Sequence, residues 1–139
     1  MDDVVLNKAA TIERCVARVR EEHAGDDENL RADQRRQDAI VLNLPRACET
    51  TIDLAMHVVR IRKLGVPQES RDAFVFLRDA GLLDGALAER MLAMVGFRNV
   101  AVHDYRRLDL AIVGAIASSH LHEFLDFARA MILLDAART

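Results

Sequence analysis

Apolar residues recur at a helical period along most of the chain. Between residues 3 and 23 they fall every three or four positions, and the same spacing returns between residues 31 and 63. This period gathers apolar side chains on one side of an α-helix. The predicted inner faces are Ile12, Val16, Val19 and His23 in the first helix, and Ile40, Leu44, Ala47, Cys48, Ile52, Ala55 and Val59 in the second.

Polar and conformationally special residues predict where these two helices end or bend. The segment 24–29 combines a glycine with acidic residues, and we expect a mobile loop there. Pro45 lies inside the second helix, lacks an N–H group and crowds the carbonyl group four residues earlier. A kink is therefore expected near Val41. The sequence Gly-Val-Pro at 65–67 ends the helix.

Three further helices are expected in the second half of the chain. A short helix takes Ser70 as its N-cap and stops at Gly81. A fourth helix takes Asp84 as its N-cap and ends near Ala101, and one continuous last helix covers about residues 109–136. Short connections between so few helices predict an all-α, antiparallel four- to five-helix bundle in a single domain, 1–139.

Composition supports this fold and excludes several classes of protein. Hydrophobic residues make up 51% of the 139 residues, aromatic residues only 4%, and there are two prolines. This mixture favours helices over a sandwich or barrel. The chain opens on Met-Asp-Asp and has no run of about 20 apolar residues. We therefore expect a cytoplasmic protein with no membrane contact, in which Cys15 and Cys48 are packed, reduced thiols.

Net charge limits how the chain would meet a nucleic acid. At −3 the formal charge gives no general attraction for RNA, so binding needs a local basic site or a patch built by oligomerisation. Both long helices are apolar over more than one face, which indicates a homodimer. The local candidates for phosphate contacts are Arg60, Arg62, Lys63, Arg106 and Arg107.

The segment 96–105 carries the clearest candidate chemistry. Arg98 continues an apolar stripe of the fourth helix, so it either pairs with an acid such as Glu49 or Asp53, or lines a cleft. Asn99 and His103 share a face if the helix continues. Arg98 and His103 are about 140° apart on an ideal helix. They converge if the helix ends near residue 101, or if two chains each contribute across a two-fold axis.

Other polar groups allow a functional and a structural interpretation. Glu49, Asp53 and His57 recur every four residues, as a metal site or as a polar seam that pairs with Arg98 or faces an interface. The chain contains no Glu-x-x-His pair of the kind used by di-metal bundles. His23 is expected to cap the first helix. A second cluster on the last helix is expected to be a solvated face: His120, His122, Glu123 and Asp126.

The run Arg-Asn-Val-Ala-Val-His-Asp-Tyr at 98–105 resembles the Arg-x4-His-x-Tyr motif of HepT toxins, in the HEPN superfamily of ribonucleases. Residues 47–57 resemble the second-helix signature of that family, and residues 74–83 its middle segment. The resemblance implies a HEPN-like helical fold and a metal-independent endoribonuclease that acts as a prokaryotic toxin and needs no cofactor.

The resemblance also implies site residues and partners. Arg98 and His103 correspond to the catalytic pair, with Asn99 as a candidate support for the RNA phosphate. Tyr105 corresponds to the tyrosine that receives AMP from a minimal nucleotidyltransferase antitoxin, which uses ATP. Two alternatives stay open from the residues themselves: His103 caps a helix, or the whole chain is a catalytically idle module that binds and regulates a nucleotidyltransferase.

Overall fold

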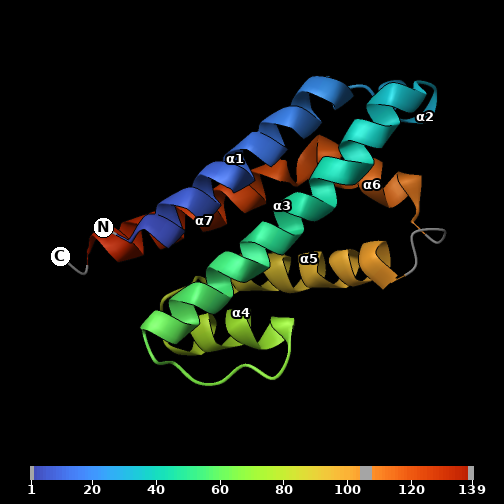
Figure 1. The fold of residues 1–139 in the computed structure, drawn as a ribbon. Helices are drawn as coiled ribbons and strands as arrows, with labels where there is room; N and C mark the ends of the chain where they lie inside the picture. The colour runs from blue at the N-terminus through green and yellow to red at the C-terminus, as the bar shows by residue number, and fades with distance from the viewer. Residues whose placement is uncertain (1, 104–107, 138–139) are drawn as a thin grey trace.

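Helices make up the regular structure throughout residues 2–103 and 108–137, which are the residues that the computed structural model describes (Figure 1). This part of the chain has no strand, so the predicted all-α class is confirmed. None of its helices is long and apolar enough to cross a membrane. The helices are α1 (Asp3–His23), α2 (Asp27–Arg31), α3 (Gln34–Ile61), α4 (Ser70–Asp79), α5 (Gly85–His103), α6 (Leu110–Ser119) and α7 (Leu121–Ala136).

Helices α1 and α3 form the spine of the bundle and run in opposite directions (Figure 1). Every residue of their two predicted inner faces is buried. Helix α7 lies along α1 and returns the C-terminal end to the side where the chain begins (Figure 1). There the backbone N–H of Asp2 donates to Asp135 Oδ2 at 2.9 Å. In the core, the rings of Phe74 and Phe127 meet edge to face at 5.4 Å, which joins α4 to α7.

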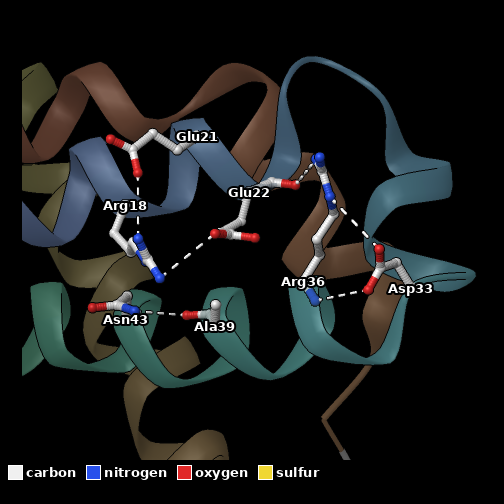
Figure 2. Close-up of polar contacts among 7 residues, drawn as sticks. All are labelled: Arg18, Glu21, Glu22, Asp33, Arg36, Ala39 and Asn43. Carbon is white, nitrogen blue, oxygen red and sulfur yellow. Dashed lines mark hydrogen bonds and ion pairs between the residues drawn. The ribbon is translucent and has the colours of Figure 1, made fainter.

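The corner between α1 and α3 differs from the expected loop. Residues 27–31 form the short helix α2, because Asp26 accepts a hydrogen bond from the N–H of Glu28 and the side chain of Leu30 is fully buried. Polar contacts close this corner (Figure 2). Arg36 donates to the backbone oxygen of Glu22 at 2.9 Å and contacts Asp33. The prediction of a mobile loop over residues 24–29 is wrong for its helical part.

Helix α3 is shorter at its start than expected and continues past its proline. It begins at Gln34 rather than near Arg31, because Asp33 takes an extended conformation and accepts a hydrogen bond from the N–H of Arg36. Helix α3 is one unbroken helix (Figure 1). Pro45 lies inside it. The kink near Val41 stays a prediction.

The N-cap of α4 is Glu69, not Ser70. Glu69 has extended backbone angles, and Asp72 accepts from its N–H at 3.2 Å, which leaves Ser70 as the first helical residue. At the other end, Gly81 has a φ of 72° directly after the helix, as expected of a stop signal. The N–H of Leu87 donates to the side chain of Asp84, which confirms that residue as the cap of α5.

The expected last helix is divided in two. His120 departs from helical geometry with a φ of −122° and a ψ of 1°, so α6 ends at Ser119 and α7 begins at Leu121. A polar run of two serines and a histidine at 118–120 interrupts the apolar sequence, and such side chains compete for backbone hydrogen bonds. The break lets α6 pack against α2 while α7 follows α1.

Candidate active site

The side chain of Arg98 is the best-defined part of the site. It projects from α5, is only 14% exposed, and donates from Nη2 to Ser70 Oγ at 2.6 Å. Its Nε lies 3.5 Å from Glu49 Oε2. Three helices therefore fix the guanidinium group: α5 supplies it, α4 accepts a hydrogen bond from it, and α3 places a carboxylate beside it.

The pairing of Arg98 is incomplete on one edge. Its Nε is buried, and in the described part of the chain it has no hydrogen-bond partner, because the contact with Glu49 lacks hydrogen-bond geometry. The side chain of Glu49 is 51% exposed, so the carboxylate stands between the arginine and solvent. The acidic partner predicted for Arg98 is thus Glu49. Asp53 contacts Lys8 instead, at 3.6 Å.

Helix α5 continues further than expected, and its continuity determines in which directions the motif positions point. It extends to His103 rather than ending near Ala101, so positions 99 and 103 are one helical turn apart on the same side. Asn99 is exposed. Positions 98 and 103 point about 140° apart on such a helix. The first of the two ways in which Arg98 and His103 were expected to converge, an early helix end, is therefore wrong.

Part of the motif lies outside the described residues. This applies to the side chain of His103 and to Tyr105, as well as to Arg106 and Arg107. The predicted roles of all four residues stay predictions.

A buried thiol lies behind Arg98. Cys48 on α3 is fully buried, and burial strongly raises the pKa of its thiol, while the charge of Arg98 acts in the opposite direction. The pKa of the Cys15 thiol is raised for the same main reason. Both cysteines are free and buried, which confirms the prediction of packed, reduced thiols. Their burial is typical of structural rather than reactive cysteines, although Arg14 and Arg46 lie near Cys15.

A groove of about 600 Å³ borders the end of the motif helix. We call it the motif groove. Helix α3 supplies most of its lining residues, and the two residues that precede His103 on α5 supply the rest. It is lined by Asp38, Val41, Leu42, Pro45, Arg46, Glu49, Ala101 and Val102.

The acidic and histidine side chains spaced along α3 do not converge on one point. Asp53 contacts Lys8, whereas His57 lies 8% exposed and donates from Nε2 to Asp2 Oδ2 at 2.8 Å. Arg60 donates to the other ring nitrogen at 2.9 Å. The hydrogen bond from His57 lowers the pKa of Asp2. No group of three or more potential metal ligands occurs among residues 2–103 and 108–137. Of the three side chains, Glu49 pairs with Arg98, as the polar-seam alternative expects.

The remaining histidines make local contacts. His23 is buried, as expected of the inner face of α1, and its Nε2 lies 2.7 Å from Asp27 Oδ1. The C-cap of α1 is Ala24 rather than His23. His122 contacts Asp126 on an exposed face, as expected. His120 lies 2.9 Å from Glu123, whose side chain is only 13% exposed, so this half of the predicted solvated face is partly buried.

Two expected phosphate contacts have partners within the fold. Arg60 donates to His57, and Arg62 donates to the backbone oxygen of Leu134 at 2.9 Å. Their role toward a phosphate stays a prediction. Conversely, Ser70 could not be recognised from the sequence as a partner of Arg98, because 28 residues separate the two and a serine before a helix is more often an N-cap.

Known proteins share both the sequence pattern and the fold. The model of the ribonuclease HepT-like family matches residues 12–131. An mRNA nuclease HepT from Shewanella oneidensis is 43% identical over 127 residues, which cover 91% of this chain and 95% of the relative.

Solved structures agree with these relatives. A tri-AMPylated HEPN toxin from Shewanella oneidensis, in complex with an MNT antitoxin, has a TM-score of 0.88 at 41% identity and covers 96% of this chain and 99% of its own. A toxin–antitoxin structure with AMP-PNP has a TM-score of 0.85 at 41% identity, with coverage of 94% and 99%. Since family model, sequence and fold agree over almost the whole length, the chain belongs to the ribonuclease HepT-like family of HEPN toxins.

Proposed function

We propose that this chain cleaves RNA without a metal ion, with Arg98 binding the scissile phosphate and His103 moving the proton. The observation that carries the proposal is the fixed, partly buried guanidinium of Arg98, five residues before the motif histidine on one helix. A planar guanidinium can bind two phosphate oxygens and stabilise the charge that develops on them. Imidazole is the side chain whose ordinary pKa suits proton transfer near neutral pH.

The cleavage step uses the RNA's own 2′-hydroxyl group. The 2′-oxygen attacks the adjacent phosphorus, a new oxygen–phosphorus bond forms, and the bond to the 5′-oxygen of the next nucleotide breaks. One imidazole takes the proton of the 2′-hydroxyl, and a protonated imidazole gives a proton to the leaving 5′-oxygen. Arg98 neutralises the additional negative charge on the phosphoryl oxygens, and Asn99 orients the phosphate from its exposed position on α5.

A homodimer supplies both histidines to one cleft in this proposal. Positions 98 and 103 diverge by about 140° on a continuous helix, which supports a site shared across a two-fold axis over one built from a single chain. The motif groove contains an exposed Leu42 and Val102, at 53% and 57%, close to the end of this helix. Apolar exposure beside the motif supports a partner surface there.

The proposed partner is a minimal nucleotidyltransferase antitoxin that inactivates the toxin by AMPylation of Tyr105. The phenol oxygen attacks the α-phosphorus of ATP, a tyrosyl–phosphate bond forms, and pyrophosphate leaves. The solved relative is named as AMPylated and in complex with an MNT antitoxin, which supports this pairing. Both reactions belong in the cytoplasm, where RNA and ATP are present and thiols stay reduced.

A catalytically idle binding module is the second candidate, favoured by the net charge of −3. One assay separates the two. Purified protein is incubated with single-stranded RNA in excess EDTA, beside His103→Ala and the matched control His122→Ala, which removes an exposed histidine on α7. We expect cleavage by the wild type and by His122→Ala, and none by His103→Ala. Equal cleavage by all three proteins contradicts a catalytic His103, and no cleavage by any of them favours the idle module.

A further inference from the structure

A second groove lies on the other side of Glu49, between α1 and α3. We call it the α1–α3 groove. Its volume is about 440 Å³, and most of the residues that line it are polar or charged. The lining residues are Thr11, Arg14, Cys15, Asn43, Arg46, Glu49 and Thr50. Cys15 is the only one of them that is buried.

Two arginines of this groove lack an acidic partner. Arg14 and Arg46 are both exposed, and neither has a carboxylate within ion-pair distance in the described part of the chain. Among the described residues, the side chain of Arg14 donates only to Thr11 Oγ1, at 3.0 Å. The contrast with Arg18, one turn further along α1, is clear, because Arg18 contacts both Glu21 and Glu22 (Figure 2). Arg14 and Arg46 are therefore available to an external anion.

The α1–α3 groove continues into the motif groove. Arg46 and Glu49 line both of them, and Glu49 contacts Arg98 at 3.5 Å. Ala101 and Val102, which directly precede His103, also line the motif groove. An extended polymer that follows this surface passes from the motif helix, across α3, to Arg14 on α1.

We propose that Arg14 and Arg46 form a second phosphate-binding subsite, which holds the backbone of single-stranded RNA beside the cleavage site. The inference rests on the proposed ribonuclease function and names residues that bind the substrate away from the reacting bond. Two guanidinium groups on neighbouring helices suit successive phosphates, because each can donate two hydrogen bonds to one phosphate. A local pair of this kind also explains how a chain with a net charge of −3 attracts RNA.

Direct binding as a function of salt tests the subsite. Fluorescence anisotropy measures the Kd of a labelled single-stranded RNA for His103→Ala protein, which keeps the RNA intact, with and without Arg14→Ala/Arg46→Ala. The slope of log K for association against log salt is negative, and each lost phosphate contact reduces its magnitude by about 0.7 on single strands. For the double variant we expect the magnitude of the slope to fall by about 1.4 and the RNA to bind at least tenfold more weakly at low salt.

Two further variants control for charge and for folding. Arg20→Ala/Arg129→Ala removes the same charge from two exposed arginines that line neither groove, and should keep the slope. Arg14→Lys/Arg46→Lys keeps the charges and should retain most of the slope while binding less tightly. Circular dichroism checks that each variant is folded.

The possible outcomes distinguish a failure of the proposed subsite from a failure of the proposed ribonuclease function. If wild-type protein cleaves RNA while the groove variant binds with unchanged slope and Kd, the subsite is wrong and the ribonuclease function stands. An equal loss of slope in the Arg20 and Arg129 variant also overturns it, because the effect is then one of total charge. If the protein neither binds nor cleaves RNA, both proposals fail.

Discussion

Arg98 and Ser70 are joined by a hydrogen bond of 2.6 Å that links α5 to the first residue of α4. The bond fixes the plane of a guanidinium group whose side chain is only 14% exposed. Its other contact, with Glu49, is longer at 3.5 Å and involves a half-exposed carboxylate. The hydrogen bond to Ser70 is thus the shorter of the two contacts that orient the N–H groups of Arg98.

Removing this constraint should reduce turnover more than substrate binding. In Ser70→Ala the guanidinium loses its neutral acceptor and samples more orientations, while its charge still attracts RNA. We expect kcat to fall about tenfold, which corresponds to about 1.4 kcal/mol and lies near the lower end of the range for a hydrogen bond to a charged group. Steady-state cleavage of a short RNA measures kcat and KM separately.

Ser70→Thr is the matched control, because it keeps the hydroxyl group at the same position of α4. It should retain most of the wild-type kcat. If Ser70→Ala keeps the wild-type kcat, or if Ser70→Thr loses as much as Ser70→Ala, the hydrogen bond does not position Arg98. A fall in melting temperature without a change in kcat would assign Ser70 a structural role alone.

Asp27 should make the stability of the fold depend on pH in the acid range. Its carboxylate lies 2.7 Å from Nε2 of buried His23, and this hydrogen bond lowers the pKa of Asp27 below its ordinary value of 3.8. The unfolded chain then binds the proton at a higher pH than the folded chain. The stabilisation is therefore complete well above pH 3.8 and is lost as the pH falls through the lower, folded pKa.

Urea unfolding between pH 6 and pH 3 measures this dependence. Wild-type protein should lose stability toward acid more steeply than Asp27→Asn, which carries no titrating group at this position. Asp79→Asn is a suitable control, since Asp79 lies 62% exposed at the end of α4. Parallel curves for wild type and Asp27→Asn would contradict the linkage.

The helical period predicted the spine of the fold well, because burial of one face decides the structure of a long amphipathic helix. The bounds of α1 and the buried faces of α1 and α3 are confirmed. The errors lie where a few polar residues decide the local backbone. A side-chain cap from Asp26 and a buried Leu30 make residues 27–31 helical, and His120 divides the last helix. Short-range patterns do not fix such choices, since they depend on contacts made after folding.

In the candidate site, too, some features could be predicted from the sequence and others depend on tertiary contacts. The motif gave Arg98, and chemical reasoning gave an acidic partner, but the choice of Glu49 over Asp53 follows from the packing of α3 against α5. Ser70 and Arg98 are 28 residues apart in the sequence, and only the tertiary fold brings them into contact. Sequence spacing could not show that either, because it reports neighbours on one helix and not contacts between helices.

Dimerisation should be measurable directly in solution. Apolar side chains remain exposed beside the motif, and a histidine from each of two chains is needed for the proposed cleavage. Light scattering should give about twice the chain mass of 15.6 kDa. Leu42→Glu places a charge on the motif groove and should shift the protein toward monomer and lower cleavage at least tenfold, whereas Leu133→Glu, on α7, should do neither. Full activity from a protein that stays monomeric at micromolar concentration would contradict the shared cleft.

Tyr105 should be the residue through which the antitoxin silences the enzyme. It is the only tyrosine of the chain and follows His103 by two residues, so an attached AMP would bring its phosphate close to the cationic motif. That phosphate carries charge and acceptor oxygens that compete with RNA for Arg98 and repel the RNA backbone.

Co-expression with a nucleotidyltransferase antitoxin of this system, followed by intact-mass spectrometry, tests the modification. Wild-type chain should gain mass in increments of AMP and lose RNA cleavage, and Tyr105→Phe should gain no such mass and keep cleaving. Ser119→Ala is a matched control for a hydroxyl group in the second half of the chain, and it should be modified like the wild type. If Tyr105→Phe is still modified, the acceptor is another residue. If the wild type is silenced while its mass stays unchanged, the antitoxin acts by covering the cleft, because AMP transfer is the only proposed step that leaves a covalent mark on the toxin.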